Sequence, residues 1–121
     1  MRKREFEELV RKAVEQIPDD FLAIMNNVDI QVRRRPTKRQ LKGLRLGSGE
    51  NLLGLYEGTP VTERTDYNMT LPDVISVFQG SIEEMCSTER EVVTQVRETV
   101  IHEVAHYFGI TDVELQAWGV T

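Results

Sequence analysis

The sequence is short of the residues that crosslink chains or bind metals in clusters. Its 121 residues include one cysteine and two histidines. A single cysteine excludes a disulfide within the chain and argues against a metal cage of several thiolates. It also fits a reducing compartment. Any site that depends on imidazole groups must therefore use the same two histidines.

Long apolar stretches are missing as well. No stretch approaches the roughly 18 consecutive apolar residues of a membrane span, and no apolar segment of a signal peptide follows the basic N-terminus. Hydrophobic residues make up 40% and charged residues 29%, as in globular proteins. The net charge of −5 argues mildly against nucleic acid as the main partner. We expect one soluble, cytoplasmic domain over residues 1–121, with no membrane partner.

Hydrophobic periodicity predicts both helices and strands. Six apolar residues from Phe6 to Ile17 follow the helical repeat, and Pro18 would end that helix. Thr88 and Glu91 have the spacing of a capping box ahead of a long apolar-periodic run. Asp19 or Asp20 could cap a short second helix, and Ser81 a helical turn. The expected helices cover residues 6–17, 21–25, 89–108 and a segment after 112, and the expected strands cover 28–32, 52–58 and 74–78, with a β-leaning segment at 61–70.

One basic run lies between positions 33 and 45, and no acidic residue interrupts it. Because proline and glycines lie nearby, we expect residues 35–50 to form an exposed loop. The loop could form a patch for nucleic acid or an acidic partner. We favour a solvated loop, because no aromatic side chains interleave with the charges for base stacking. The basic residues are Arg33, Arg34, Arg35, Lys38, Arg39, Lys42 and Arg45.

Both histidines lie in one short motif, H-E-V-A-H, at residues 102–106. His102 and His106 are four residues apart, so on a helix they share a face and could bind one metal ion. Glu103 could face the same cleft without being a ligand and take a proton from an activated water. Gly109 can end the helix in the left-handed conformation and turn the chain back.

The third ligand of such a site cannot be a histidine of this chain. A carboxylate or Cys86 must supply it. Asp112 stands at the position where motifs of the metzincin type, H-E-x-x-H-x-x-G-x-x-H, carry their third ligand. A glutamate from a further helix is a cramped alternative, because little chain follows Glu114.

Three blocks of sequence resemble the small bacterial zincin-like metallopeptidases, the minimal zincins. They are L-L-G-L-Y-E-G-T-P (52–60), L-P-D-V-I-S-V-F (71–78) and T-V-I-H-E-V-A-H-Y-F-G-I-T-D (99–112). The resemblance covers nearly the whole chain. It implies a compact α+β fold, in which a small mixed β-sheet packs with a long active-site helix and a few other helices. It also implies zinc (Zn2+) held by His102, His106 and Asp112, with Glu103 as the catalytic base. Unlike the metzincins, the sequence has aspartate at the third ligand position, and all four methionines precede the motif.

The resulting hypothesis is a zinc-dependent metallopeptidase that hydrolyses peptide bonds in a peptide or protein substrate. A zinc-activated water would attack, with Glu103 as general base. An alternative is a zinc-binding module with little or no proteolytic activity, acting as a binding or regulatory protein. A third is a basic-loop adaptor for nucleic acid. The candidates for stabilising a transition-state oxyanion are Tyr56, Arg64, Tyr67 and Tyr107.

Overall fold

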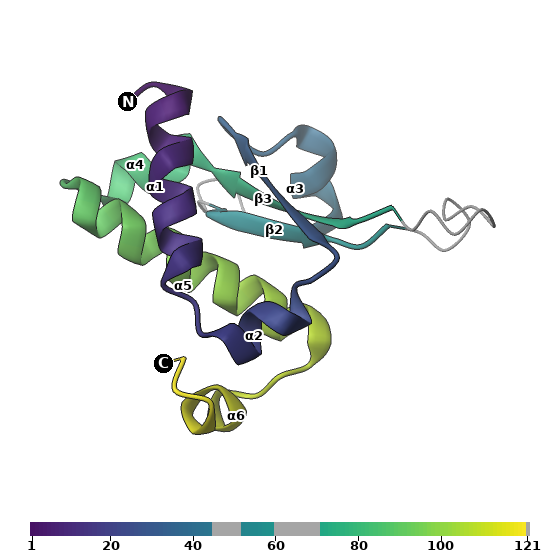
Figure 1. Cartoon of the computed structure of the whole chain (residues 1–121). Helices are drawn as coiled ribbons and strands as arrows, with labels where there is room; N and C mark the ends of the chain where they lie inside the picture. The colour runs from purple at the N-terminus through teal and green to yellow at the C-terminus, as the bar shows by residue number, and fades with distance from the viewer. Residues whose placement is uncertain (45–51, 60–70, 121) are drawn as a thin grey trace.

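A three-stranded mixed β-sheet lies at the centre of the molecule (Figure 1). The computed structural model describes residues 1–44, 52–59 and 71–120. Strands β1 (Val28–Arg33) and β3 (Asp73–Phe78) pair in parallel, and β2 (Gly54–Glu57) pairs antiparallel with β3. The strand order is β1-β3-β2, so the strand expected at residues 74–78 is the central one.

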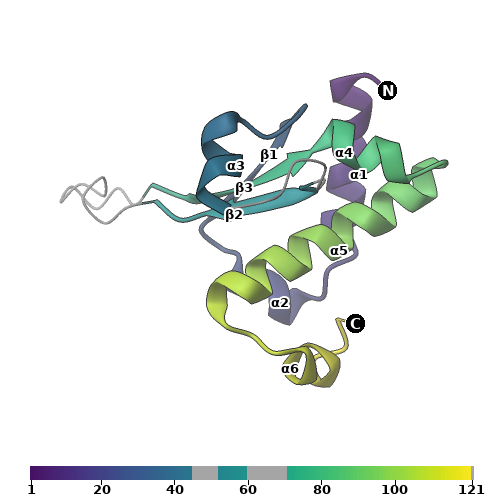
Figure 2. The ribbon, with the colours of Figure 1, turned by 180° about the vertical axis from the view of Figure 1, so that it is seen from behind.

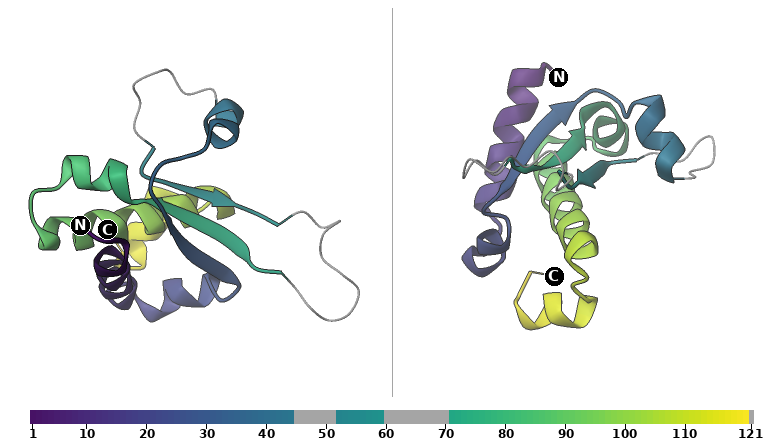
Figure 3. Two further views of the ribbon diagram at one scale, coloured as in Figure 1. Left: turned by 90° about the horizontal axis from the view of Figure 1, so that it is seen from above. Right: turned by 90° about the vertical axis from the view of Figure 1, so that its right-hand side faces the viewer.

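Helices cover one face of this sheet. Helix α5 (Glu89–Phe108) contacts β2 and β3, and α1 (Lys3–Glu15) packs against α5. Helix α3 (Lys38–Leu44) lies apart from these, on the side of the sheet opposite α5 (Figures 2 and 3). The short helices α2 (Asp19–Ile24), α4 (Gln79–Met85) and α6 (Asp112–Ala117) complete the described chain. The α+β fold with a long helix beside a small mixed sheet is therefore confirmed.

The hydrophobic core lies between the sheet and helices α1 and α5. Phe6 of α1, Ile75 of β3 and Val100 of α5 are fully buried there. Phe21 of α2 and Leu115 of α6 join the buried apolar residues, so both short helices are anchored by an apolar side chain. Within the described ranges, no helix combines the length and the apolar character needed to cross a membrane.

Helix α5 has the bounds that the sequence predicts. The Thr88 hydroxyl accepts a hydrogen bond from the backbone N–H of Glu91, which satisfies one free donor of the first turn. The Glu91 carboxylate accepts a hydrogen bond from the N–H of Ser87 and not from that of the N-cap residue Thr88. The second bond of the predicted capping box is therefore displaced by one residue. The helix ends at Gly109 with φ = 69°, a left-handed conformation that glycine adopts at little cost.

The expected loop over residues 35–50 is wrong for its first half. Residues 38–44 form α3, because Thr37 and Gln40 make a reciprocal capping box in which each side chain bonds the other's backbone N–H. The T-K-R-Q spacing of this box was the signal for a helix. Residues 45–50, like the β-leaning segment 61–70, lie outside the described residues.

Two smaller predictions are also wrong. Neither Asp19 nor Asp20 caps α2: Pro18 holds the N-cap position, and both aspartates lie in the first turn. Ser81 does not begin a helical turn, because α4 starts two residues earlier and buries it.

Strand β2 and helix α5 approach each other closely at Gly54. A Cβ atom there would lie 2.6 Å from the Thr99 side chain and 3.1 Å from the backbone oxygen of Ser76. Both distances are shorter than normal van der Waals contacts, so only glycine fits. The close backbone approach that a glycine in a strand can mark therefore occurs here.

We expect Gly54→Ala to lower the free energy of unfolding by about 1–3 kcal/mol, because its methyl group overpacks the contact with α5. Thr99→Ser removes the nearer clashing atom and should restore part of this loss in the double variant. Gly43→Ala is the matched control: its Cβ meets nothing within 4 Å, and alanine in a helix should stabilise by about 0.5–1 kcal/mol. Chemical denaturation measures all four proteins. Equal stability of Gly54→Ala and wild type would contradict the tight contact.

Candidate metal and catalytic site

The residues of the sequence motif lie in the C-terminal turns of α5 and at the start of α6. His102, Glu103, His106 and Asp112 line one cavity of about 420 Å³. Helix α5 carries the first three, and the left-handed turn at Gly109 redirects the chain into α6, where Asp112 is the first residue (Figure 1). All four residues that the sequence singles out therefore border the same space.

The glutamate of the motif is half-buried between α5 and β2. Its Oε1 accepts a hydrogen bond of 3.1 Å from the backbone N–H of Tyr56 in β2. Burial raises the pKa of Glu103, and this effect outweighs the opposing influence of the Tyr56 N–H and of the imidazoles of His106 and His102. A carboxylate with raised proton affinity, fixed at one oxygen, suits a proton-transfer role.

An aromatic cluster stands beside Glu103. The ring of Tyr56 is buried and stacks on Tyr107, with 4.0 Å between ring centroids, while Phe108 meets both rings edge-on. Tyr107 and Phe108 are each nearly half exposed. The hydroxyl of Tyr107 lies so close to Gly58 that a Cβ there would be 2.3 Å from its oxygen. The cluster therefore joins β2 to the end of α5.

Two of the candidate oxyanion donors, Tyr56 and Tyr107, lie within the described residues, and neither is placed as such a donor. The Tyr56 hydroxyl donates a 2.7 Å hydrogen bond to Oδ2 of Asp73, so it is already engaged within the protein. Tyr107 is the residue after His106 but does not line the cavity of the motif. Arg64 and Tyr67 lie outside the described residues.

Helix α6 holds Asp112 by a capping box that the sequence reading missed. The Thr111 hydroxyl accepts from the N–H of Glu114, and the Glu114 carboxylate accepts from the N–H of Thr111. The T-D-V-E spacing was the available signal. Among the described residues, no hydrogen bond or ion pair engages the exposed Asp112 carboxylate, so it remains available as a ligand.

The two alternatives for the third ligand are less well placed. Cys86 follows α4 and lines a different cavity, with Arg90 and Glu91. Burial raises the pKa of its thiol, which works against the thiolate form that binds metals. The Glu114 carboxylate is held in the capping box of α6. Besides Glu103, Asp112 is the acidic residue that lines the cavity of the motif among the described residues.

The donor set fits a zinc ion by its chemistry, since two imidazoles and a carboxylate are common zinc ligands. Within the described part of the chain, however, no three His, Cys, Asp or Glu side chains have converged to ligand distances. His102, His106 and Asp112 are all exposed, so rotation of their side chains displaces no core atoms. Their assignment as the three ligands stays a prediction.

Comparison with known proteins finds a matching family and structural similarity to a solved protein. The model of the family described as zincin-like metallopeptidase matches residues 25–120. A conserved hypothetical protein from Thermo thermophilus is similar in structure, with a TM-score of 0.57 and 23% identity, over 89% of this chain and 94% of that one. At this identity the likeness concerns the fold alone. No curated protein matches the chain.

We expect Thr111→Ala to loosen the start of α6, because it removes the hydroxyl that accepts the Glu114 N–H. The free energy of unfolding should fall by about 1 kcal/mol, and amide hydrogen exchange should accelerate across residues 112–117. Thr94→Ala, on the exposed side of α5, is the matched control and should cost nothing. Unchanged exchange in α6 would show that the box does not hold Asp112 in place.

Proposed function

The chain belongs to the zincin-like metallopeptidase family, and we propose that it is a zinc-dependent hydrolase of peptide bonds. The observation that carries this proposal is the position of four residues on one cavity: His102, His106 and Asp112 as metal ligands, and Glu103 as general base. Peptides or proteins would be the substrates. The family match supports the reaction class, and the cavity supports the assignment of roles.

Three protein ligands would leave one position open for reaction, as catalytic zinc sites require. His102 and His106 lie one helical turn apart on the exposed side of α5, and both residues line the cavity. Asp112 would approach from the opposite wall, on α6. Zinc, when bound, supplies a Lewis acid that acidifies a water molecule and polarises the scissile carbonyl.

Glu103 would take a proton from the attacking water and pass it to the leaving amine. Its hydrogen bond to the Tyr56 N–H fixes one carboxylate oxygen and leaves the other for this transfer. The same N–H belongs to β2, which is an edge strand of the described sheet. An extended peptide running along β2 would therefore pass the general base, and pairing with a sheet edge is a common way to bind such peptides.

A second candidate function is a zinc-binding module that turns over no substrate. One observation favours it: the hydroxyl of Tyr56, a candidate oxyanion donor, is bonded to Asp73. Such a module would act as a binding or regulatory protein, and zinc content without peptidase activity would distinguish it from the enzyme.

Glu103→Gln should retain zinc and reduce kcat by about 100- to 10,000-fold, because the amide keeps the shape of the side chain but accepts no proton. The assay is cleavage of a broad peptide library followed by mass spectrometry. Glu98→Gln, an exposed glutamate on the same helix, is the control and should cleave as wild type does. Cleavage by Glu103→Gln at the wild-type rate would refute the general base. Zinc-loaded wild type that cleaves nothing would favour the binding module.

Asp112→Ala should lose bound zinc, since it removes the only oxygen ligand of the proposed set. Inductively coupled plasma mass spectrometry of the purified protein gives the zinc-to-protein ratio, which we expect to fall from about one to well below one. Asp19→Ala removes an aspartate from the same position of another short helix, α2, and should keep the ratio. Full zinc occupancy in Asp112→Ala would require a different third ligand.

A further inference from the structure

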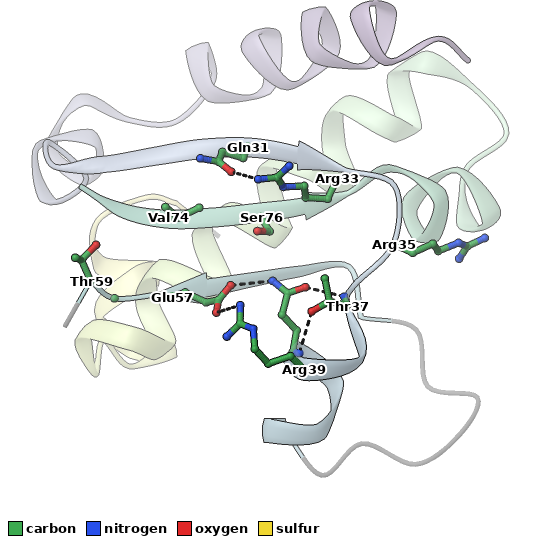
Figure 4. Close-up of a pocket in the computed structure, with 11 residues that line it drawn as sticks. Gln31, Arg33, Arg35, Thr37, Arg39, Glu57, Thr59, Val74 and Ser76 are labelled. Atoms are coloured by element: carbon green, nitrogen blue, oxygen red, sulfur yellow. Dashed lines mark hydrogen bonds and ion pairs between the residues drawn. The ribbon is translucent and has the colours of Figure 1, made fainter. Parts of the chain in front are cut away.

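A second cavity, of about 440 Å³, lies on the face of the sheet opposite α5 (Figure 4). All three strands and the segment leading into α3 contribute to it. Its lining is dominated by polar and charged side chains, including Gln31, Arg33, Thr37, Arg39, Gln40 and Glu57. The cavity shares no residue with the one that holds the histidine motif.

The alternation of the strands explains this polar face. In β3, Ile75 and Val77 are buried in the core, while Val74 and Ser76, which alternate with them, line the outer cavity. In β1, Val32 is buried, while Gln31 and Arg33 line the same cavity. The cavity side of the sheet therefore carries the polar Gln31 and Arg33 beside the apolar Val74 and the buried Ser76.

One wall of the cavity is held in place by its own hydrogen bonds. The Gln40 amide donates to Oε1 of Glu57 at 2.8 Å, and Arg39 lies 3.7 Å from the other carboxylate oxygen. Gln40 is itself fixed by the capping box with Thr37. Helix α3 is thus tied to β2, and the charge of Glu57 is largely matched by Arg39 (Figure 4).

The opposite wall has a cation without a counter-charge. Arg33 donates to Oε1 of Gln31 at 2.7 Å, and Gln31 donates in turn to Asp29. Across the described ranges no carboxylate pairs with Arg33, whereas its neighbours Arg34 and Arg35 pair with Glu83 and Glu84. A guanidinium has five N–H donors in a planar fork that matches phosphate and carboxylate groups. Most of the donors of Arg33 are therefore left for a ligand.

We propose that this cavity binds a small polar metabolite through its phosphate or carboxylate group, with Arg33 as the main contact. The volume lies within the range of small-molecule sites. Gln31 and Thr37 supply neutral hydrogen-bonding groups for the rest of the ligand. No aromatic side chain lines the described cavity, so nucleobase stacking has no support there, and we favour a small oxyanion over a nucleic acid. The proposal does not depend on the metal site.

The test uses the full chain and two probes, inorganic phosphate and acetate, titrated at constant ionic strength and followed by amide chemical shifts. With one or both probes we expect saturable shifts confined to the cavity, around residues 31–33, 37–40 and 74–76. Phosphate alone would indicate a phosphorylated ligand, acetate alone a carboxylate. The control site around residues 102–112 should not respond in parallel. Shifts that stay linear for both probes, or that spread evenly over all basic residues, would overturn the proposal.

Variants at the exposed Arg33 locate the contact. Arg33→Gln should weaken binding at least tenfold, and Arg33→Lys, which keeps the charge but loses the fork, should weaken it less. Arg4→Gln on α1 removes a charge elsewhere and should bind as wild type does. Equal affinity in Arg33→Gln would overturn the assignment. A second result would also overturn the assignment. If neither small anion gives saturable binding, but the protein binds a single-stranded oligonucleotide in a salt-sensitive way that Arg33→Gln abolishes, then the partner is nucleic acid.

Discussion

The contact between α5 and β2 is the interaction on which the rest of the molecule depends. Gly54 has no side chain, so the helix approaches the strand closely at Thr99 and Glu103. This approach brings the Glu103 carboxylate to the backbone N–H of Tyr56. Burying a carboxylate without a donor is costly, and so is leaving the N–H of a covered strand without an acceptor. Each group here satisfies the other.

The candidate site combines a rigid helix, α5, with a short helix, α6, that is less strongly anchored. Buried valines in successive turns, from Val92 to Val104, anchor α5 in the core, so the helix backbone that carries His102 and His106 is fixed. Asp112 stands on a helix of six residues that is held by Leu115, Val120 and a capping box. Closing a metal site would therefore depend mainly on side-chain rotation and on how α6 adjusts to the fixed helix.

Charge is distributed unevenly over the two faces of the sheet. The candidate catalytic residues lie on α5 and α6, on one side of the sheet, while the opposite side collects arginines from β1 and α3. Glu83, Glu84 and Glu57 pair with Arg34, Arg35 and Arg39, so three of the seven basic residues of the run take part in ion pairs. This pairing weakens the nucleic-acid interpretation of the run. In the described part of the run Arg33, Lys38 and Lys42 form no ion pair, and of these three Arg33 lines the outer cavity.

Local chemistry of the chain determined much of this protein. The periodicity of α5, its Thr88 cap and its Gly109 end are properties of neighbouring residues, and so is the one-turn spacing of His102 and His106. They were readable in advance for that reason. Helix α3 and the box that starts α6 were equally local, and their spacing was overlooked.

Only the tertiary structure decided what depends on residues distant in sequence. The partner of Glu103 lies 47 positions away, in β2. The ion pairs that occupy Arg34 and Arg35 come from α4, 49 positions away. No short-range pattern encodes such pairings, because they arise when burial of apolar faces brings separate elements together. The motif could thus be read from the sequence, whereas the surroundings that tune it, and the polar cavity behind the sheet, could not.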